Sequence, residues 1–434
     1  MKVKSIIAQE RDVSDFPRIF RVRQRFSAER VDDVAGEVER QLSGLDLAGR
    51  VRAGQTVAIT AGSRGVANMA TILRAMVDHL RQLGAEPFLV PAMGSHGGGT
   101  AEGQLGVLTS YGITEESMGC PIRSSMETVV VGQTGEGFPV HFDRHAYEAD
   151  HVVVCNRVKP HTRFAGPIES GLMKMMLIGL GKKNGAEVYH RAIADYSFAQ
   201  IIRSVVDKVF ANCSILAGLA VIENAFDETA RIEAVLPEDF ETREVGLLEA
   251  AKQHMARLPF DQVDLLLIDR IGKNISGTGL DTNVVGRKFD DHKAVEGELP
   301  RVGLIGIRGL TEETHGNAIG MGLAEFCRSQ LLRETDVAAT RLNAITAKHV
   351  SAAMAPLDYE TDGEMLEAAL PGGPEERQGV RLLWIADTLQ LHELECSEAY
   401  WEEAQGREDL EVLTELRELP LGEDGQLPLV EEVG

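Results

Sequence analysis

The chain has 434 residues, with 44 Lys and Arg against 67 Asp and Glu, and a formal net charge of −23. This length suffices for two or three domains of ~100–200 residues each, and the negative charge argues against a nucleic acid partner, whose phosphates would be repelled. No apolar run reaches the ~18 residues that a membrane helix needs, and the N-terminus becomes charged too early for a signal peptide, so we expect a cytoplasmic protein without a membrane partner. The five scattered cysteines form no CxxC pair, which favours reduced thiols over a disulfide framework, an iron–sulfur cluster or a structural zinc site.

Strand and helix patterns alternate along the chain. Two buried strands flank an amphipathic helix to give a β-α-β unit, and the alternation then continues. The expected strands are residues 56–60, 87–90, 151–155 and 215–222, and the expected helices are residues 68–83, 198–210 and 241–256. A second block begins near Val263 and returns as a strand at residues 302–310. We therefore predict an α/β fold of two domains with mostly parallel sheets, residues 1–260 and 261–434. The acidic tail from Glu393 to Glu432 closes the second domain and is expected to be a solvated helical surface.

The loops after the first two strands are candidates for ligand binding, because open α/β sheets bind ligands at the carboxyl ends of their strands. Arg64 lies in the turn AGSRGV, where its guanidinium could hold a carboxylate by two parallel hydrogen bonds. His96 lies in GSHGGG, and the backbone of Gly97 and Gly98 could cradle a phosphate. Neither loop matches GxGxxG or the P-loop, so nicotinamide dinucleotide as a diffusible cosubstrate is not supported.

The segment from Asn156 to His190 indicates a functional site. It collects basic side chains that are almost never fully buried without partners, namely Arg157, Lys159, His161, Arg163 and Lys174. Together with Arg64 they would give an anionic substrate a locally positive environment. In the second block, Lys273, Asn274, Asp281 and Arg287 form a polar loop that either binds substrate or sugar hydroxyls or is an ordinary solvated loop.

In their order, and in the spacing from Lys174 to His190, these residues resemble the nickel-dependent lactate racemase family, over roughly residues 58–308. The resemblance implies an active site in a cleft between two α/β domains and a nickel pincer nucleotide (pyridinium-3-thioamide-5-thiocarboxylic acid mononucleotide with nickel), inserted with the help of cofactor-biosynthesis proteins. It further implies that Lys174 tethers the nucleotide, that His190 ligates nickel, and that Arg64, Gly97 and Gly98 contact the cofactor. Arg64, Lys159 and Lys273 would bind the substrate.

The same resemblance implies racemisation or epimerisation of a small 2-hydroxy acid by reversible hydride transfer. The C2 hydrogen of such an acid is hard to remove as a proton, because the carboxylate opposes a carbanion; hydride removal gives a planar 2-keto acid instead. His96 and His161 would be the two bases for the hydroxyl proton, since imidazole is neutral and basic near pH 7. The family's lactate enzymes have an acidic residue where this chain has Ala61, and a shorter interval than His161 to Lys174. Alanine would make room for a bulkier or differently polar acid.

Two other readings remain open at this stage. One is a protein that binds nickel or the cofactor without catalysis, which would need Lys174 and His190 but not two bases. The other is a zinc or iron enzyme in which His96, His161 and His190 form a three-histidine centre. Metal analysis separates this last reading, because it predicts zinc or iron without a nucleotide.

Overall fold

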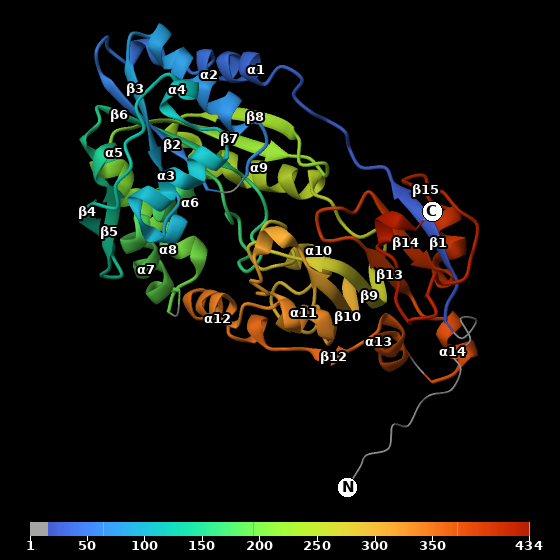
Figure 1. The fold of residues 1–434 in the computed structure, drawn as a ribbon. Helices are drawn as coiled ribbons and strands as arrows, with labels where there is room; N and C mark the ends of the chain where they lie inside the picture. The colour runs from blue at the N-terminus through green and yellow to red at the C-terminus, as the bar shows by residue number, and fades with distance from the viewer. Residues whose placement is uncertain (1–15, 64, 194, 371, 434) are drawn as a thin grey trace. The chain divides into compact units, whose positions relative to one another are not determined.

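The computed structural model describes residues 16–63, 65–193, 195–370 and 372–433 (Figure 1). Contacts divide the chain into two compact units. The first unit is Ser27–Met255, and the second unit is Ala256–Gly434 together with the N-terminal residues up to Phe26.

The first unit is built on a five-stranded sheet of order β3-β2-β6-β7-β8, in which only β8 runs antiparallel to its neighbour. The strands are β2 (Thr56–Ala61), β3 (Glu86–Pro91), β6 (His151–Arg157), β7 (Ile215–Glu223) and β8 (Thr229–Val235). A separate hairpin consists of β4 (Thr128–Gln133) and β5 (Pro139–Asp143). The helices are α1 (Val34–Ser43), α2 (Met69–Gln82), α3 (Ala101–Ser110), α4 (Glu115–Met118), α5 (Arg144–Glu148), α6 (Leu172–Lys174), α7 (Lys182–Ala192), α8 (Phe198–Asn212) and α9 (Phe240–His254).

Both faces of this sheet are covered, which explains the nearly continuous apolar runs of its strands. Val57 and Ile59 point into a core shared with α1 and α2. Ala58, between them, points into a second core shared with α7, α8 and α9. This alternation along one strand confirms the expected α/β architecture, and all four predicted strands and three predicted helices of this unit are present.

The second unit contains an eight-stranded sheet of order β12-β11-β10-β9-β13-β14-β1-β15. Its first five strands are mutually parallel and the last three pair antiparallel. The strands are β9 (Gln262–Ile271), β10 (Arg301–Leu310), β11 (Phe326–Arg328), β12 (Leu357–Tyr359), β13 (Leu382–Ile385), β14 (Glu393–Ser397), β1 (Ile19–Gln24) and β15 (Leu410–Val412). The helices are α10 (Thr282–Val285), α11 (Ser329–Glu334), α12 (Val337–Thr346), α13 (Asp362–Ala369), α14 (Pro374–Gln378) and α15 (Trp401–Gln405).

The N-terminal strand belongs to this second sheet. β1 pairs with β14, with Ile19 opposite Ser397 and Arg23 opposite Glu393. The residues before Phe26 therefore group with the C-terminal part of the chain, although they come first in the sequence.

The expectation that the acidic tail is a solvated helical surface holds for Glu402 and Glu403, which are exposed on α15, but is wrong for Glu395. Glu393–Ser397 forms the strand β14, and the Glu395 side chain is fully buried between β13 and β1. Arg21 and Arg417 each donate to Oε1 of Glu395 at 2.8 Å. The two arginines compensate the buried negative charge of Glu395. This acidic residue of the tail therefore stabilises the fold and does not form a solvated surface.

Every helix in the described part of the chain is too short or too polar to cross a bilayer.

Candidate active site

The loops after β2 and β3 meet at a contact between a serine and a histidine. Oγ of Ser63 lies 2.6 Å from Nδ1 of His96, whose side chain is otherwise exposed. The hydroxyl of Tyr111, just after α3, donates to the carbonyl oxygen of Ser63 at 2.9 Å and holds the β2 loop in place. Arg64, the next residue, lies outside the described residues. The two strand ends thus bring His96 beside Ser63.

The backbone of the His96 loop is fixed by a buried glutamine and by its glycines. Nε2 of Gln104, fully buried in α3, donates to the carbonyl oxygens of Gly94 at 2.9 Å and His96 at 3.3 Å. Gly97 has a φ of +64°, and a Cβ there would lie 2.6 Å from the backbone nitrogen of Gln104. Gly98 also has a positive φ, of +69°, but faces open space. Backbone geometry therefore favours glycine at both positions, whether or not this loop also binds a ligand.

The loop after β6 carries His161 and is held by its own side chains. The backbone N–H of His161 donates to Oε2 of Glu169 at 2.8 Å, and the backbone N–H of Arg163 donates to Nδ1 of His161 at 3.0 Å. The hydroxyl of Ser170 accepts from the N–H of Lys159 at 2.7 Å and donates to its carbonyl oxygen at 2.6 Å. The His161 ring is therefore oriented by local hydrogen bonds.

An aromatic cluster of Phe164, Tyr189 and Phe198 lies beside this loop. Phe164 stacks on Phe198 with ring centroids 4.5 Å apart, and Tyr189 meets both rings edge-on at 5.9 and 5.7 Å. The three residues come from the β6 loop, α7 and the start of α8. Tyr189 and Phe198 are buried and Phe164 is partly buried, so the cluster presents an apolar surface; burial also raises the pKa of the Tyr189 hydroxyl well above its usual range.

Three predicted site residues converge on this cluster. The His161 ring stacks on Phe164 at 3.6 Å, the His190 ring lies 5.4 Å from Tyr189, and Nζ of Lys174 lies 5.3 Å from the centre of the Phe164 ring. The cation–π geometry of Lys174 also includes Phe198, at 6.0 Å. His161 and Lys174 therefore share the contact with Phe164, whereas His190 contacts Tyr189, its neighbour in the chain.

A buried ion pair joins the helix of His190 to the end of β5, and hydrogen bonds of the same lysine reach β3 and α3. Nζ of Lys182, at the start of α7, lies 3.0 Å from Oδ2 of Asp143, and neither side chain is exposed. The same ammonium donates to the carbonyl oxygen of Pro91 and, at 3.3 Å, to Oε1 of Gln104. Burial lowers the pKa of Lys182, although Asp143 acts in the opposite direction. The sequence showed only two adjacent lysines in GKKNG, with no signal that one of them is buried.

A second unforeseen group, Glu244 of α9, lies under the helix that carries Lys174. Its carboxylate is buried and accepts from the backbone N–H groups of Leu172 and, at 3.2 Å, Met173. It thus caps the N-terminal turn that leads to Lys174. Burial raises the pKa of Glu244 to about 8, against the opposing effect of these two N–H groups.

Several basic residues named from the sequence are engaged elsewhere. Arg157 is paired with Glu223. In the second unit, Nζ of Lys273 donates to the carbonyl oxygen of Gly277 at 2.6 Å. The expectation that Arg287 belongs to a polar ligand-binding loop is wrong, because its side chain is fully buried and donates to Glu325 at 2.9 and 3.1 Å.

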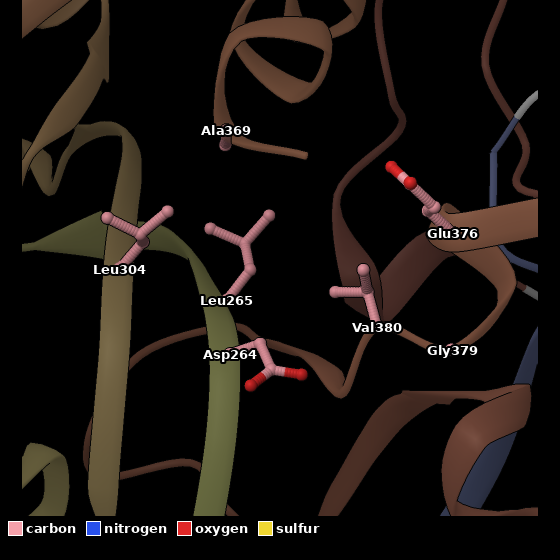
Figure 2. A pocket seen from close by; sticks show the side chains of 7 residues that line it. All are labelled: Asp264, Leu265, Leu304, Ala369, Glu376, Gly379 and Val380. Atoms are coloured by element: carbon pink, nitrogen blue, oxygen red, sulfur yellow. The ribbon is translucent and has the colours of Figure 1, made fainter. Parts of the chain in front are cut away.

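A separate pocket of about 390 Å³ lies in the second unit, near the start of β9. Figure 2 shows Leu265 and Leu304 on neighbouring strands, with the carboxylate of Asp264 below them. Its lining includes none of the residues singled out from the sequence.

The described residues contain no group of three or more His, Cys, Asp or Glu side chains arranged to hold a metal ion. His96, His161 and His190 therefore do not form the three-histidine centre that the sequence left open.

Comparison with known proteins gives a match to a sequence family and matches to solved structures. Residues 18–200 match the family described as the lactate racemase N-terminal domain. The fold is similar to that of the lactate racemase apoprotein from Thermoanaerobacterium thermosaccharolyticum, with a TM-score of 0.52 and 16% identity over 89% of this chain and 97% of that one. A protein from Thermotoga maritima has a TM-score of 0.46 and 13% identity over 64% of this chain and 70% of its own. No curated protein in the comparison matches the chain. Residues 18–200 are therefore similar in sequence to the lactate racemase N-terminal domain, and the chain shares its fold with the lactate racemase apoprotein.

Proposed function

We propose that this protein is a racemase or epimerase of 2-hydroxy acids that acts by reversible hydride transfer to a nickel pincer nucleotide. The observation that carries the proposal is that His161 and Lys174 both contact Phe164, in the same aromatic cluster as Tyr189, the neighbour of His190. It is supported by the match of residues 18–200 to the lactate racemase N-terminal domain.

The residues present fit the chemistry of such a cofactor. A pincer ligand brings its own donor atoms, so nickel needs only one imidazole from the protein, and tetragonal nickel accepts imidazole readily. His190, beside Tyr189 and outside any group of three ligating residues among those described, suits this requirement. His190 would be the nickel ligand and Lys174 would hold the nucleotide covalently, with the backbone of Gly97 and Gly98 near its phosphate. The bound nucleotide would supply a hydride acceptor.

The protein side chains would handle the proton and the carboxylate. The substrate hydroxyl loses its proton to a histidine, His96 or His161, while C2 loses hydrogen with its electron pair, so that the alcohol becomes a 2-keto acid; the reverse steps restore it on either face. Arg64 and Lys159 would bind the carboxylate, whose charge they complement. The aromatic wall would exclude water from this chemistry.

The test is racemisation by the loaded protein. Coproduction with enzymes that make the nucleotide should give a nickel-containing protein that abolishes the optical rotation of at least one enantiopure acid among aliphatic 2-hydroxy acids and sugar acids. His190→Ala should lose nickel and activity, whereas His145→Ala, a histidine on α5, should retain both. A protein with full nickel and nucleotide content that leaves every acid in the panel unchanged would contradict the proposal.

A further inference from the structure

The second unit contains another cavity, of about 440 Å³, whose lining includes four arginines. They are Arg25, Arg257, Arg381 and Arg407. Arginines repel one another unless opposite charges lie between them, and the chain as a whole carries a net charge of −23. The gathering of cations around one cavity of such a chain indicates a place for an anion.

This cavity lies at the opposite end of β9 from Lys273. Its lining includes Gln262, the first residue of β9, and Arg381, the residue before β13. β9 and β13 are parallel, so both contribute their amino ends, whereas Lys273 follows the carboxyl end of β9. The cavity is therefore a separate site from the residues proposed for catalysis.

Buried side chains hold the wall of the cavity in place. Phe260 and Tyr400 stack with ring centroids 4.0 Å apart, and the Tyr400 hydroxyl donates to the carbonyl oxygen of Gln262 at 2.6 Å. Nε2 of Gln24, itself buried, donates to the carbonyl oxygen of Arg257 at 3.0 Å. The backbone that presents Arg257 is thus fixed without a ligand, which lowers the cost of binding one.

The three acidic residues of the lining act mainly on Arg407. Nε of Arg407 donates to Oδ1 of Asp409 at 2.9 Å. That hydrogen bond raises the pKa of Arg407, and the charges of Glu403 and Asp261 act in the same direction. Arg407 also donates to the carbonyl oxygen of Pro259. The guanidinium of Arg407 is therefore already engaged by the protein.

Arg257 and Arg381 have no such partners. Within the described part of the chain, neither guanidinium makes a hydrogen bond or an ion pair with the protein. The pKa of Asp409 is lowered chiefly by Arg407, and the charge of Arg257 adds to this effect, so Arg257 faces the same cavity. A guanidinium binds a carboxylate or a phosphate by two parallel hydrogen bonds, and two guanidiniums from different segments can bind separate oxygen atoms of one ligand.

We propose that this cavity binds a small dianion, a dicarboxylate or a phosphate, through Arg257 and Arg381. The proposal does not depend on the proposed function. Arg25 and Arg257 lie one residue from Phe26 and Ala256, the two positions at which the chain passes between the units. A bound dianion would therefore also stiffen both connecting segments.

Isothermal titration calorimetry of the full-length protein at about pH 8 and fixed ionic strength tests the ligand class, with succinate, inorganic phosphate and acetate. We expect saturable binding of succinate or phosphate, and binding of acetate at least ~10-fold weaker, because a single carboxylate engages only one guanidinium. Binding of succinate alone identifies a dicarboxylate site, and binding of phosphate alone a phosphate site. Equal affinity for acetate, or no binding of either dianion, would overturn the proposal.

Substitutions test the two arginines. Arg257→Gln and Arg381→Gln should each weaken binding at least ~10-fold, because each removes hydrogen bonds to a charged group. Both variants should keep the wild-type urea midpoint without ligand, because neither side chain has a protein partner. Arg333→Gln, at an exposed arginine of α11 outside the cavity, is the matched control and should bind as the wild type does.

Hydrogen exchange locates the bound ligand. The dianion that binds should slow amide exchange in residues 22–28 and 254–262 of the wild type, and should not do so in Arg257→Gln. Undiminished affinity in both arginine variants, or protection confined to other parts of the chain, would contradict the proposed site.

Discussion

Replacing Lys182 by methionine should destabilise the first unit by about 3–5 kcal/mol, the cost of removing one partner of a buried ion pair. Nζ of Lys182 lies 3.0 Å from the Asp143 carboxylate and both side chains are fully buried. Methionine fills most of the space, so the loss comes mainly from the unpaired carboxylate and from the carbonyl oxygen of Pro91, a buried acceptor whose lost donor costs ~1–3 kcal/mol. The cost is limited because Oδ1 of Asp143 still accepts from the N–H of Ala146 at 2.8 Å.

Urea denaturation followed by far-ultraviolet circular dichroism measures this loss. At an m-value of ~1–3 kcal/mol per molar urea, 3 kcal/mol lowers the midpoint by about 1 M or more. Lys183→Met is the matched control, because Lys183 is exposed and should change stability by no more than ~0.5 kcal/mol. The double variant Lys182→Met, Asp143→Asn should recover much of the loss, since no uncompensated charge stays buried. Equal midpoints for Lys182→Met and Lys183→Met would refute the reasoning.

Three further outcomes are expected. Burial raises the pKa of Glu244 to about 8 from an ordinary 4.5, so between these pH values the folded protein keeps a proton that the unfolded chain releases. The free energy of unfolding should therefore fall as pH rises from 4.5 to 8. Urea midpoints measured across this range should show the fall in the wild type and a weaker fall in Glu244→Gln. Gly97→Ala should lower the urea midpoint more than Gly98→Ala, because both have positive φ but only at Gly97 would a Cβ collide with backbone; equal midpoints would contradict the geometry. Denatured holo protein should carry one cofactor mass on the peptide containing Lys174, and Lys174→Arg should carry none; a bare chain mass in the wild type would refute the tether.

The first sheet could be predicted from the sequence because its signals are local. Buried strands such as β2 and β3 are continuous apolar runs, and α2 between them has an amphipathic period. Placing His96 at a strand end followed from this order, since parallel strands end at the same edge.

The features that were missed depend on partners far away in the chain. Nothing near Glu395 shows that Arg21 will pair with it, because that contact requires β1 to join the sheet of β14. The burial of Arg287 likewise depends on Glu325. The acidic pattern around Glu395 therefore predicts a solvated surface, because clustered charge favours exposure unless partners from distant parts of the chain are present.

The candidate site also contains residues that the sequence identifies and contacts that only the fold reveals. The sequence pointed to His161, Lys174 and His190 through residue type and spacing, but not to the aromatic cluster on which they converge. Phe164 and Phe198 belong to different elements, and aromatic residues in apolar segments are ordinary core residues unless a fold places them beside charged groups. Ser63 was missed for a similar reason, because a serine in a turn is common and its contact with His96 joins two loops.

The measurement that tests the central claim most directly is racemisation by the loaded protein in deuterium oxide. If hydrogen leaves C2 with its electron pair and returns to it shielded from water, the product should contain little or no deuterium at C2, and substrate already deuterated at C2 should react more slowly. Extensive incorporation of solvent deuterium at C2 would show a carbanion route. It would contradict hydride transfer, and with it the roles proposed here for His96, His161 and the nickel held by His190.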